Sequence, residues 1–171
     1  VLKKFDFKAW PLKASQVGFV TTSIVKKRLE VEDTQTLKLK DFGQITFASA
    51  SQGGYYPNDK DKANQDAFIS GAQVSGIKKE DNGILFAVFD GHGPNGHTCA
   101  RKARDHVTEQ FVEGMMLDNS ARELSTIHDT VGTSIASAYR RTSLRLESGE
   151  FGVDASHSGT TAVSLFVTKD F

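Results

Sequence analysis

The chain has 171 residues, of which 38% are hydrophobic, so its composition is that of a soluble globular domain able to bury a sizeable core. Its 21 Lys and Arg side chains balance 21 Asp and Glu side chains, which excludes a strong overall field for nucleic acid or an anionic membrane. Cys99 is the only cysteine, so no internal disulfide can form, and we expect a reducing compartment, the cytoplasm or also the nucleus. The longest apolar run, Ile84 to Phe89, is too short to cross a bilayer as a helix.

Residues 1–40 are predicted to form an N-terminal extension of a domain that spans residues 41–171. Trp10 and an apolar patch from Val17 to Val25 lie among many lysines and glutamates. Such a segment would dock on the domain or on a partner protein, or else serve as a partly disordered linker. The chain opens on Val1 and stops at Phe171 directly after a strand-like run, so we expect a segment of a longer protein.

Alternating and continuous apolar runs predict several strands. Leu37 and Leu39, then Ile45 and Phe47, alternate with polar residues, and residues 51–61 contain the turn formers of a loop. Further strands are expected at 66–70, 84–89 and 160–168, with a polar connection at 75–83. The run at 84–89 is continuously apolar, which predicts burial on both faces, and the β-branched run at 160–168 is also expected to be buried.

Two helices are predicted between the last two of these strands. Asn95 would cap the first helix, and apolar residues at every fourth position form one stripe along it: Cys99, Ala103, Val107, Phe111 and Met115. A second helix is expected from about Ser120 to Leu146, with a buried face made by Leu124, Ile127, Val131, Ile135, Ala138 and Thr142. The order of strands, helices and strand predicts a layered domain of the α/β or α+β class.

The segment FAVFDGHGPNGH, from Phe86 to His97, is the strongest candidate for a functional site. Its apolar strand would deliver the carboxylate of Asp90, after which Gly91 and Gly93 let the backbone turn sharply. A charged group in that position is costly unless a cation or a hydrogen-bond network compensates it, and a hard divalent metal is a natural compensation. The alternative is an Asx-type turn in which Asp90 only caps the next helix. Asp66, if it starts a neighbouring strand, would supply a second carboxylate.

Three ordered segments, ANQDAF (63–68), FAVFDGHG (86–93) and SGTTAV (158–163), resemble the motifs of the metal-dependent type 2C family of protein serine/threonine phosphatases. The stretch GYYPNDKDKANQDAF is similar to the plant and protist branch of that family. The resemblance implies an α+β fold, a β-sandwich flanked by helices in α-β-β-α layers, of which the N-terminal part is present here and the C-terminal half is absent.

The same resemblance implies two Mg²⁺ or Mn²⁺ ions that activate a water for attack on phosphoserine or phosphothreonine in phosphoprotein substrates. Asp90 is similar to the carboxylate that bridges both ions. Asp66 and the carbonyl of Gly91 resemble further ligands, direct or through water. His92 resembles the general acid that protonates the leaving oxygen, for which a side chain that titrates near neutrality is suited; alternatively it is an exposed turn histidine.

Three positions depart from the family pattern. Gln65 stands where many members have Glu, and its neutral amide would coordinate weakly or orient a water. An upstream phosphate-binding arginine has no match, so Lys60 or Lys62 would substitute as a point charge, or else be solvated. Asp154 matches an acid that helps hold a third metal, but Ala155 replaces the second acid that is common there.

Two carboxylates and a carbonyl do not satisfy two hard divalent ions, so we expect residues 1–171 alone to turn over little or nothing. Further acidic ligands of the family lie in Asp-Gly and Asp-Asn motifs of the C-terminal half. The competing interpretation is a phosphatase-like scaffold or regulatory module without catalysis, which the loss of those downstream aspartates would favour. A nucleotide-binding site is a weak third option, since the turn at Gly91 lacks the Gly-x-Gly-x-x-Gly spacing.

Overall fold

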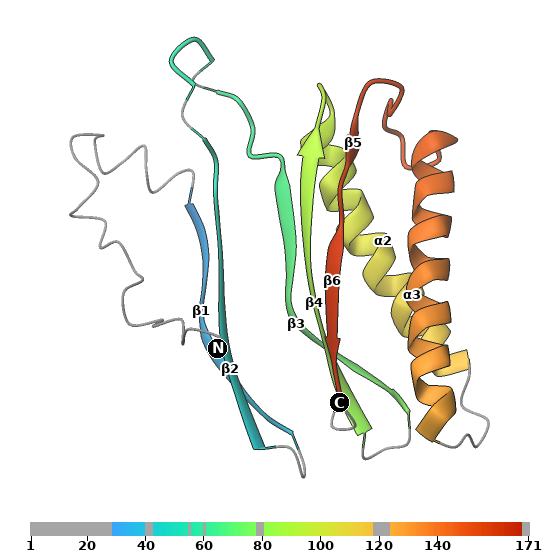
Figure 1. Ribbon diagram of the computed structural model, residues 1–171. Helices are drawn as coiled ribbons and strands as arrows, with labels where there is room; N and C mark the ends of the chain where they lie inside the picture. Colours follow the sequence, from blue (N-terminus) through green and yellow to red (C-terminus); the bar gives the residue numbers. More distant parts are fainter. Residues whose placement is uncertain are drawn as a thin grey trace, which may run out of the picture.

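The computed structural model describes residues 29–39, 43–54, 56–59, 61–77, 81–117 and 124–168. These residues form an α+β arrangement of two β-sheets and two helices, in agreement with the predicted class (Figure 1). In chain order the elements are β1 (Leu29–Leu39), β2 (Gly43–Gln52), β3 (Asp66–Ile77), β4 (Asp81–His92), α2 (Gly96–Leu117), α3 (Leu124–Glu147), β5 (Gly159–Thr160) and β6 (Val163–Val167).

The strand β4 is the centre of the larger sheet. It pairs with β3 on one side, and β5 and β6 both pair with it on the other, all antiparallel. The smaller sheet is the antiparallel hairpin of β1 and β2. The strand β1 lies within the predicted extension at 1–40, so part of that region supplies a strand, while residues 1–28 lie outside the described residues. The boundary at residue 40 and the docking role of the extension stay predictions.

Helix α2 covers one face of the larger sheet, and α3 packs on α2 (Figure 1). The predicted stripe of α2 is confirmed, since Cys99, Ala103, Val107, Phe111 and Met115 are all buried. The stripe packs with residues of β3 and β4 that alternate along each strand: Ala67, Ile69, Leu85, Ala87 and Phe89. A period of two along the strands and of four along the helix therefore builds one shared core.

A buried histidine joins the two helices. His106 of α2 lies 2.8 Å from the Thr142 hydroxyl through Nδ1 and 2.8 Å from Arg145 Nη1 through Nε2. Because a guanidinium can only donate, Nε2 accepts and Nδ1 carries the proton, which it donates to Thr142. Thr142 in turn donates to the Ala138 carbonyl. Burial, and then the charge of Arg145, lowers the pKa of His106.

The β1–β2 hairpin lies on the sheet face that points away from the helices (Figure 1). Phe47 of β2 meets Phe86 of β4 edge to face, with ring centroids 4.9 Å apart. The Ser49 hydroxyl donates to that of Ser70 on β3 at 2.7 Å. A side chain at Gly71, where φ is +71°, would overlap the Phe47 ring. Hairpin, larger sheet and helices thus form three layers, and the fourth layer of the expected sandwich stays a prediction.

The predicted burial of 84–89 on both faces is correct at Ile84, which is 0% exposed, but wrong at Val88, and the predicted burial of 160–168 is wrong at Val163 and Leu165. Val88 is 59% exposed, and its neighbours on β6, Val163 and Leu165, are 73% and 62% exposed. These side chains point to the face that the helices do not cover, and within the described residues the hairpin covers that face only in part. A second correction concerns 75–83, where β3 continues to Ile77 and β4 already starts at Asp81.

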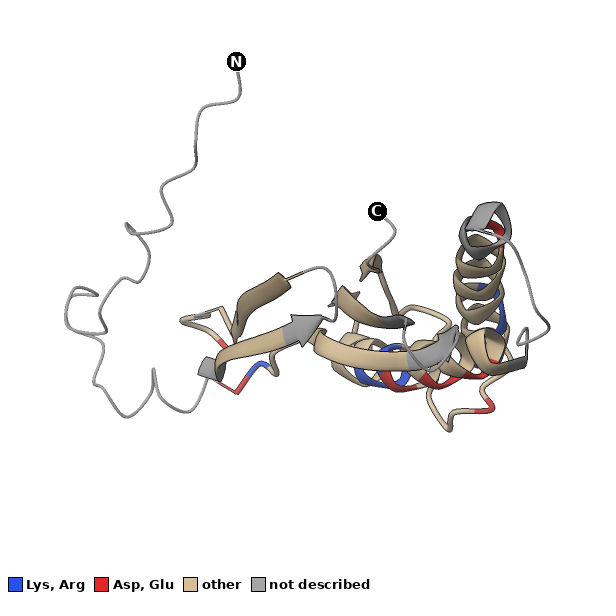
Figure 2. Ribbon diagram, turned by 90° about the horizontal axis from the view of Figure 1, so that it is seen from below, with Lys and Arg blue, Asp and Glu red and all other residues tan. Residues whose placement is uncertain are grey.

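Asn95 precedes α2 as predicted, and its carbonyl accepts from the Cys99 amide at 3.0 Å. Among the described residues no first-turn amide donates to its side-chain oxygen, and its amide nitrogen donates to the Asp154 carbonyl at 2.9 Å. Along α2 the basic residues Arg101, Lys102 and Arg104 come before the acidic residues Asp105, Glu109 and Glu113, so blue precedes red along this helix (Figure 2). Among the described helices, none has the length and apolar character needed to cross a membrane.

Candidate metal centre and phosphate pocket

Two aspartates face each other across the β3–β4 ladder. Asp66 is the first residue of β3, and its register partner on β4 is Asp90. Opposed like charges in an antiparallel pair destabilise the sheet, so a fold retains them where something else needs them. Burial, and then the charge of Asp90, raises the pKa of Asp66. A cation between the two strands would remove this repulsion.

Both aspartates line one small pocket of about 140 Å³. The remaining wall comes from the end of β2, the following loop and the turn after β4: Gln52, Gly54, Tyr56, Lys62, Ala63, Asn64, Gln65 and Gly91. Five of the residues predicted from sequence therefore meet at one place: Lys62, Gln65, Asp66, Asp90 and Gly91. The lining does not include His92 or Asp154, and Lys60 lies outside the described residues.

Gly91 can only be glycine in this fold. A Cβ there would overlap the backbone carbonyls of Gly96 and Gln65. The Gly91 amide donates to the Gln65 carbonyl at 3.1 Å, and the preceding carbonyl, that of Asp90, accepts from the Thr161 amide at 2.9 Å. The peptide unit between Asp90 and Gly91 is thereby held on both sides, by Gln65 and by Thr161.

Gln65 reaches across the turn that follows β4. Its Nε2 donates to the carbonyl of Gly93 at 2.6 Å. Gly93 has φ +82°, and a side chain there would overlap the His157 carbonyl, so the turn is tightly enclosed. The position needs a donor, which Gln supplies and an ionised Glu would not. This contact gives the amide of Gln65 a partner within the chain.

Lys62 provides the positive charge of the pocket. Its ammonium group lies 3.7 Å from the centre of the Tyr56 ring, which is a cation–π geometry. Tyr56 lines the same pocket. The aromatic face therefore holds the lysine at the wall that also carries the two aspartates, where it could attract an anionic group.

His92 follows Asp90 on the same face of β4, because side chains two positions apart in a strand point the same way. It is exposed, and its register partner is Gly159 of β5. The imidazole lies against that glycine, since a Cβ at Gly159 would come 2.9 Å from His92 Nε2. The glycine of the SGTTAV segment thus leaves room for the ring.

The carboxylate of Asp154 is engaged in its own turn. It accepts from the Ser156 hydroxyl at 2.6 Å and from the Ser156 amide at 3.0 Å. These hydrogen bonds lower the pKa of Asp154. Its role at a third metal stays a prediction.

Several residues that position the site were given no role in it by the sequence. The Asn64 side chain donates to the Ser51 hydroxyl at 2.8 Å and accepts from the Asp66 amide at 3.2 Å, which ties β2 to the start of β3. The Ser158 hydroxyl accepts from the Asn95 amide at 2.8 Å. The sequence placed Asn64 and Ser158 in motifs and Asn95 at the start of a helix, but it did not predict these contacts, of which those to Ser51 and Ser158 join distant segments of the chain.

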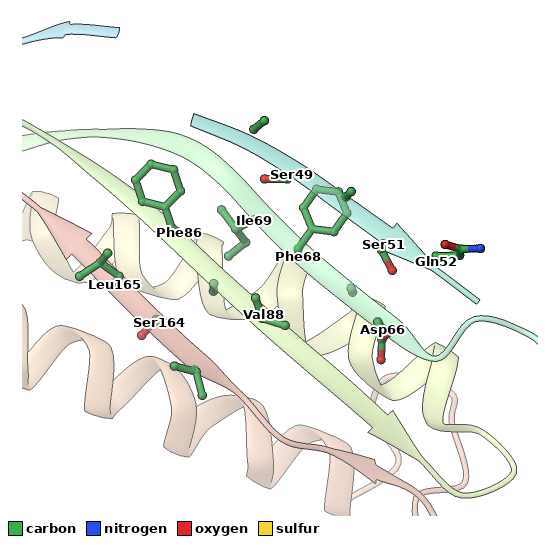
Figure 3. A pocket seen from close by; sticks show the side chains of 15 residues that line it. Ser49, Ser51, Gln52, Asp66, Phe68, Ile69, Phe86, Val88, Ser164 and Leu165 are labelled. Carbon is green, nitrogen blue, oxygen red and sulfur yellow. The ribbon is translucent and has the colours of Figure 1, made fainter. Parts of the chain in front are cut away.

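A larger groove of about 530 Å³ adjoins the pocket on the same sheet face (Figure 3). Gln52 and Asp66 line both hollows. Figure 3 shows Asp66 at one end of the groove and the apolar side chains Phe86 and Leu165 toward the other. The carboxylate of Asp66 therefore lies at one end of the groove, while the hydroxyls of Ser49 and Ser164 lie along it.

The donor set of the pocket suits a hard divalent cation. Carboxylate, amide and carbonyl oxygens are the ligands that Mg²⁺ and Mn²⁺ prefer, and no thiol or imidazole lines the pocket. The opposed aspartates are the observation that a cation would explain. Across the described part of the chain, however, no three His, Cys, Asp or Glu side chains gather to hold a metal ion.

Comparison with known proteins identifies relatives of this chain. It is 32% identical over 126 residues to "Probable protein phosphatase 2C 35" of Arabidopsis thaliana, which covers 74% of this chain and 32% of that protein. It is 35% identical over 104 residues to "Probable protein phosphatase 2C 64" of Oryza sativa subsp. japonica, covering 60% of this chain and 22% of that protein. It is 29% identical over 154 residues to "Probable protein phosphatase 2C 65" of Arabidopsis thaliana, covering 82% and 38%.

The chain thus spans about a third or less of the length of the first two of these relatives. No protein-family model and no solved structure matches it. Any segment of 126 residues within a chain of 171 includes positions 46–126, so the match to the first relative contains both opposed aspartates. On these similarities, the chain belongs to the protein phosphatase 2C family.

Proposed function

We propose that this chain carries part of the active site of a metal-dependent protein serine/threonine phosphatase. The observation that carries the proposal is the register pair of Asp66 and Asp90 at the edge of a pocket that also contains Lys62. Opposed carboxylates fit cations, and a lysine beside them fits the phosphoryl oxygens of a substrate. The names of the relatives support the reaction class.

Asp66, Asp90 and the Gly91 carbonyl would hold Mg²⁺ or Mn²⁺, two ions in the complete site. When bound, such ions supply Lewis acidity that neutralises phosphoryl oxygens and lowers the pKa of water. The contribution of the chain itself is to fix the carboxylates: the Gly91 amide donates to the Gln65 carbonyl, which ties β4 to the residue before β3, and the Asp66 amide donates to the Asn64 side chain.

His92 would act as the general acid, donating a proton to the serine or threonine oxygen as it leaves. Its place on the same strand face as Asp90, two residues further along, supports this role. Lys62, oriented by Tyr56, would bind the phosphoryl group as a point charge. The substrates would be phosphoproteins.

We further propose that residues 1–171 alone bind these ions weakly and hydrolyse substrate slowly. Only two carboxylates line the described pocket, and two hard divalent ions need more oxygen ligands than these residues offer. The remaining ligands would come from outside the described residues. Gln65 gives no support to a non-catalytic scaffold, because its hydrogen bond to Gly93 accounts for it.

The test is Mn²⁺-dependent release of phosphate from a phosphoserine peptide, with EDTA as the blank. It is measured for residues 1–171 and for the longer gene product that contains them. We expect activity in the longer protein, loss in its Asp90→Asn variant, and no change in Asp129→Asn, a matched substitution at an exposed position of α3. Inactivity of the longer protein with metal would refute the proposed function, and robust activity of residues 1–171 would refute the split site.

A further inference from the structure

Gln65 holds the turn after β4 at two points. Its side-chain Nε2 donates to the Gly93 carbonyl at 2.6 Å. Its own carbonyl accepts from the Gly91 amide at 3.1 Å. These two hydrogen bonds involve the residues directly before and after His92. Gln65 therefore holds the backbone on both sides of the residue that carries the imidazole.

The opposite side of the turn is closed by the segment before β5. A Cβ at Gly93 would overlap the His157 carbonyl, and a Cβ at Gly159 would lie 2.9 Å from His92 Nε2. The turn therefore lies between Gln65, which donates a hydrogen bond to it, and residues 157–159, which lie close against it. Because Gly93 adopts a φ of +82°, which glycine reaches without steric cost, the turn depends on such outside contacts to select one conformation.

The chemistry of the contact separates two roles for Gln65. A residue that coordinates a cation or orients a water would direct its oxygen into the pocket and could be replaced by Glu. Here the amide nitrogen is committed to a carbonyl, and an ionised Glu would place an acceptor against that acceptor. The contact thus gives the amide nitrogen of Gln65 a structural task that a carboxylate could not perform.

We propose that Gln65 is a positioning residue that fixes the Gly91–Gly93 turn and, through it, the direction of the His92 imidazole. This inference rests on the proposed function, since it assigns the effect on catalysis to the general acid. It predicts that loss of the Gln65 side chain impairs proton donation and leaves cation binding unchanged.

The first measurement does not need activity. In ¹⁵N-resolved NMR spectra of the chain, the Gln65 side-chain amide, assigned by its absence in Gln65→Ala, should show one proton shifted downfield and slow to exchange with solvent. The side-chain amide of Gln73, which is exposed on β3, the strand that follows Gln65, is the matched control and should exchange fast. Equal exchange of the two amides would overturn the inference.

The second measurement compares leaving groups in the gene product that contains the chain. A phosphoserine peptide needs a proton for its alkoxide, whereas p-nitrophenyl phosphate releases a stable anion without one. In Gln65→Ala and Gln65→Glu we expect kcat on the phosphopeptide to fall about 10-fold with KM little changed, a loss of about 1.4 kcal/mol in transition-state stabilisation. In both variants, activity on p-nitrophenyl phosphate and the Mn²⁺ dissociation constant should stay within a few-fold of the wild type. In the control Gln73→Ala, activity on both substrates and the Mn²⁺ dissociation constant should also stay within a few-fold of the wild type.

A double-mutant cycle with His92→Ala distinguishes positioning from a general structural role. If Gln65 acts through His92, adding Gln65→Ala to His92→Ala causes no further loss on the phosphopeptide. Equal losses on both substrates, additive losses in the cycle, or weaker Mn²⁺ binding would each overturn the inference. If the wild-type protein hydrolyses neither substrate, the proposed function fails, and the NMR exchange rates alone decide whether Gln65 holds the turn.

Discussion

Replacing Asp66 by Asn should stabilise the metal-free protein while weakening its response to metal. The change removes one of two charges that the β3–β4 register places opposite each other. Asn has nearly the same shape, and the Asp66 amide that donates to Asn64 at 3.2 Å belongs to the backbone and is retained. The substitution therefore isolates the charge.

The magnitude follows from the strand geometry. Directly opposed residues have Cβ atoms about 5 Å apart, at which two unit charges repel by about 0.8 kcal/mol in a water-like dielectric and by about 3 kcal/mol at an effective dielectric of about 20. Asp66 is half-buried, and Asp90 is exposed, so we expect a gain of about 1 kcal/mol. For a chain of this size that raises Tm by about 2 to 4 °C.

The sign of the pH dependence is set by the raised pKa of Asp66. In the window between its unfolded value and its higher folded value, the folded state holds the proton more tightly than the unfolded chain. The stability of the wild type relative to Asp66→Asn therefore falls as pH rises through the folded pKa. At pH values below the unfolded pKa, Asp66 is protonated in both the folded and the unfolded state, so the difference in stability between the two proteins disappears. At neutral pH the repulsion acts in full.

The assay is thermal unfolding at pH 7 in low salt, with EDTA or with Mn²⁺, and with Asp129→Asn as the matched control. We expect Asp66→Asn to unfold at a higher temperature than the wild type in EDTA, and the gain to shrink in high salt. Mn²⁺ should then raise the Tm of the wild type more than that of the variant. A variant less stable than the wild type in EDTA, or one that Mn²⁺ stabilises equally, would show that Asp66 is held by favourable contacts and not as half of a cation site.

Three further outcomes follow from the structure. In chemical denaturation, Gly91→Ala should lower the free energy of unfolding by about 1 to 3 kcal/mol, because its Cβ would overlap backbone atoms. The control Gly132→Ala, which has open space around it in α3, should raise the free energy of unfolding by about 0.5 to 1 kcal/mol. Because the pKa of His106 is lowered in the folded state, the free energy of unfolding should fall as pH drops below about 6.5, by at most about 1.4 kcal/mol per pH unit. In chemical denaturation at pH 7.5 and pH 5.5, His106→Gln should reduce this fall. The charged groups that face this histidine are Glu109, Glu150, Arg141 and Arg145. Lys62→Met should weaken inhibition by inorganic phosphate in the active protein while Lys62→Arg keeps it, and equal inhibition of all three forms would remove Lys62 from the site.

The sequence alone determined the elements whose signal is local. The stripe from Cys99 to Met115 identified α2 and its buried face, because helix periodicity reports one neighbouring surface directly. The motif around Asp90 identified Gly91, a position where only glycine fits the backbone, and the order of the motifs identified the family. These features depend on residues close together in the chain.

Burial on the second face of a strand depends on a partner that the strand's own residues do not specify. Val88 and Leu165 have the same composition as core residues, yet they are exposed, since coverage of that face comes from other segments. The apolar pattern was correct about the strands and wrong about their surroundings.

Tertiary structure alone decided how the candidate site is assembled. The sequence suggested neighbouring carboxylates, but only the antiparallel register placed Asp66 directly opposite Asp90. Gln65 was predicted to coordinate weakly or to orient a water, and the fold adds a contact that the sequence did not suggest, from its amide nitrogen to the carbonyl of Gly93, 28 residues away. The chemistry of a side chain follows from its residue type. Its interaction partner depends on strand pairing and on how the chain folds back, because these bring together residues that are far apart in the sequence.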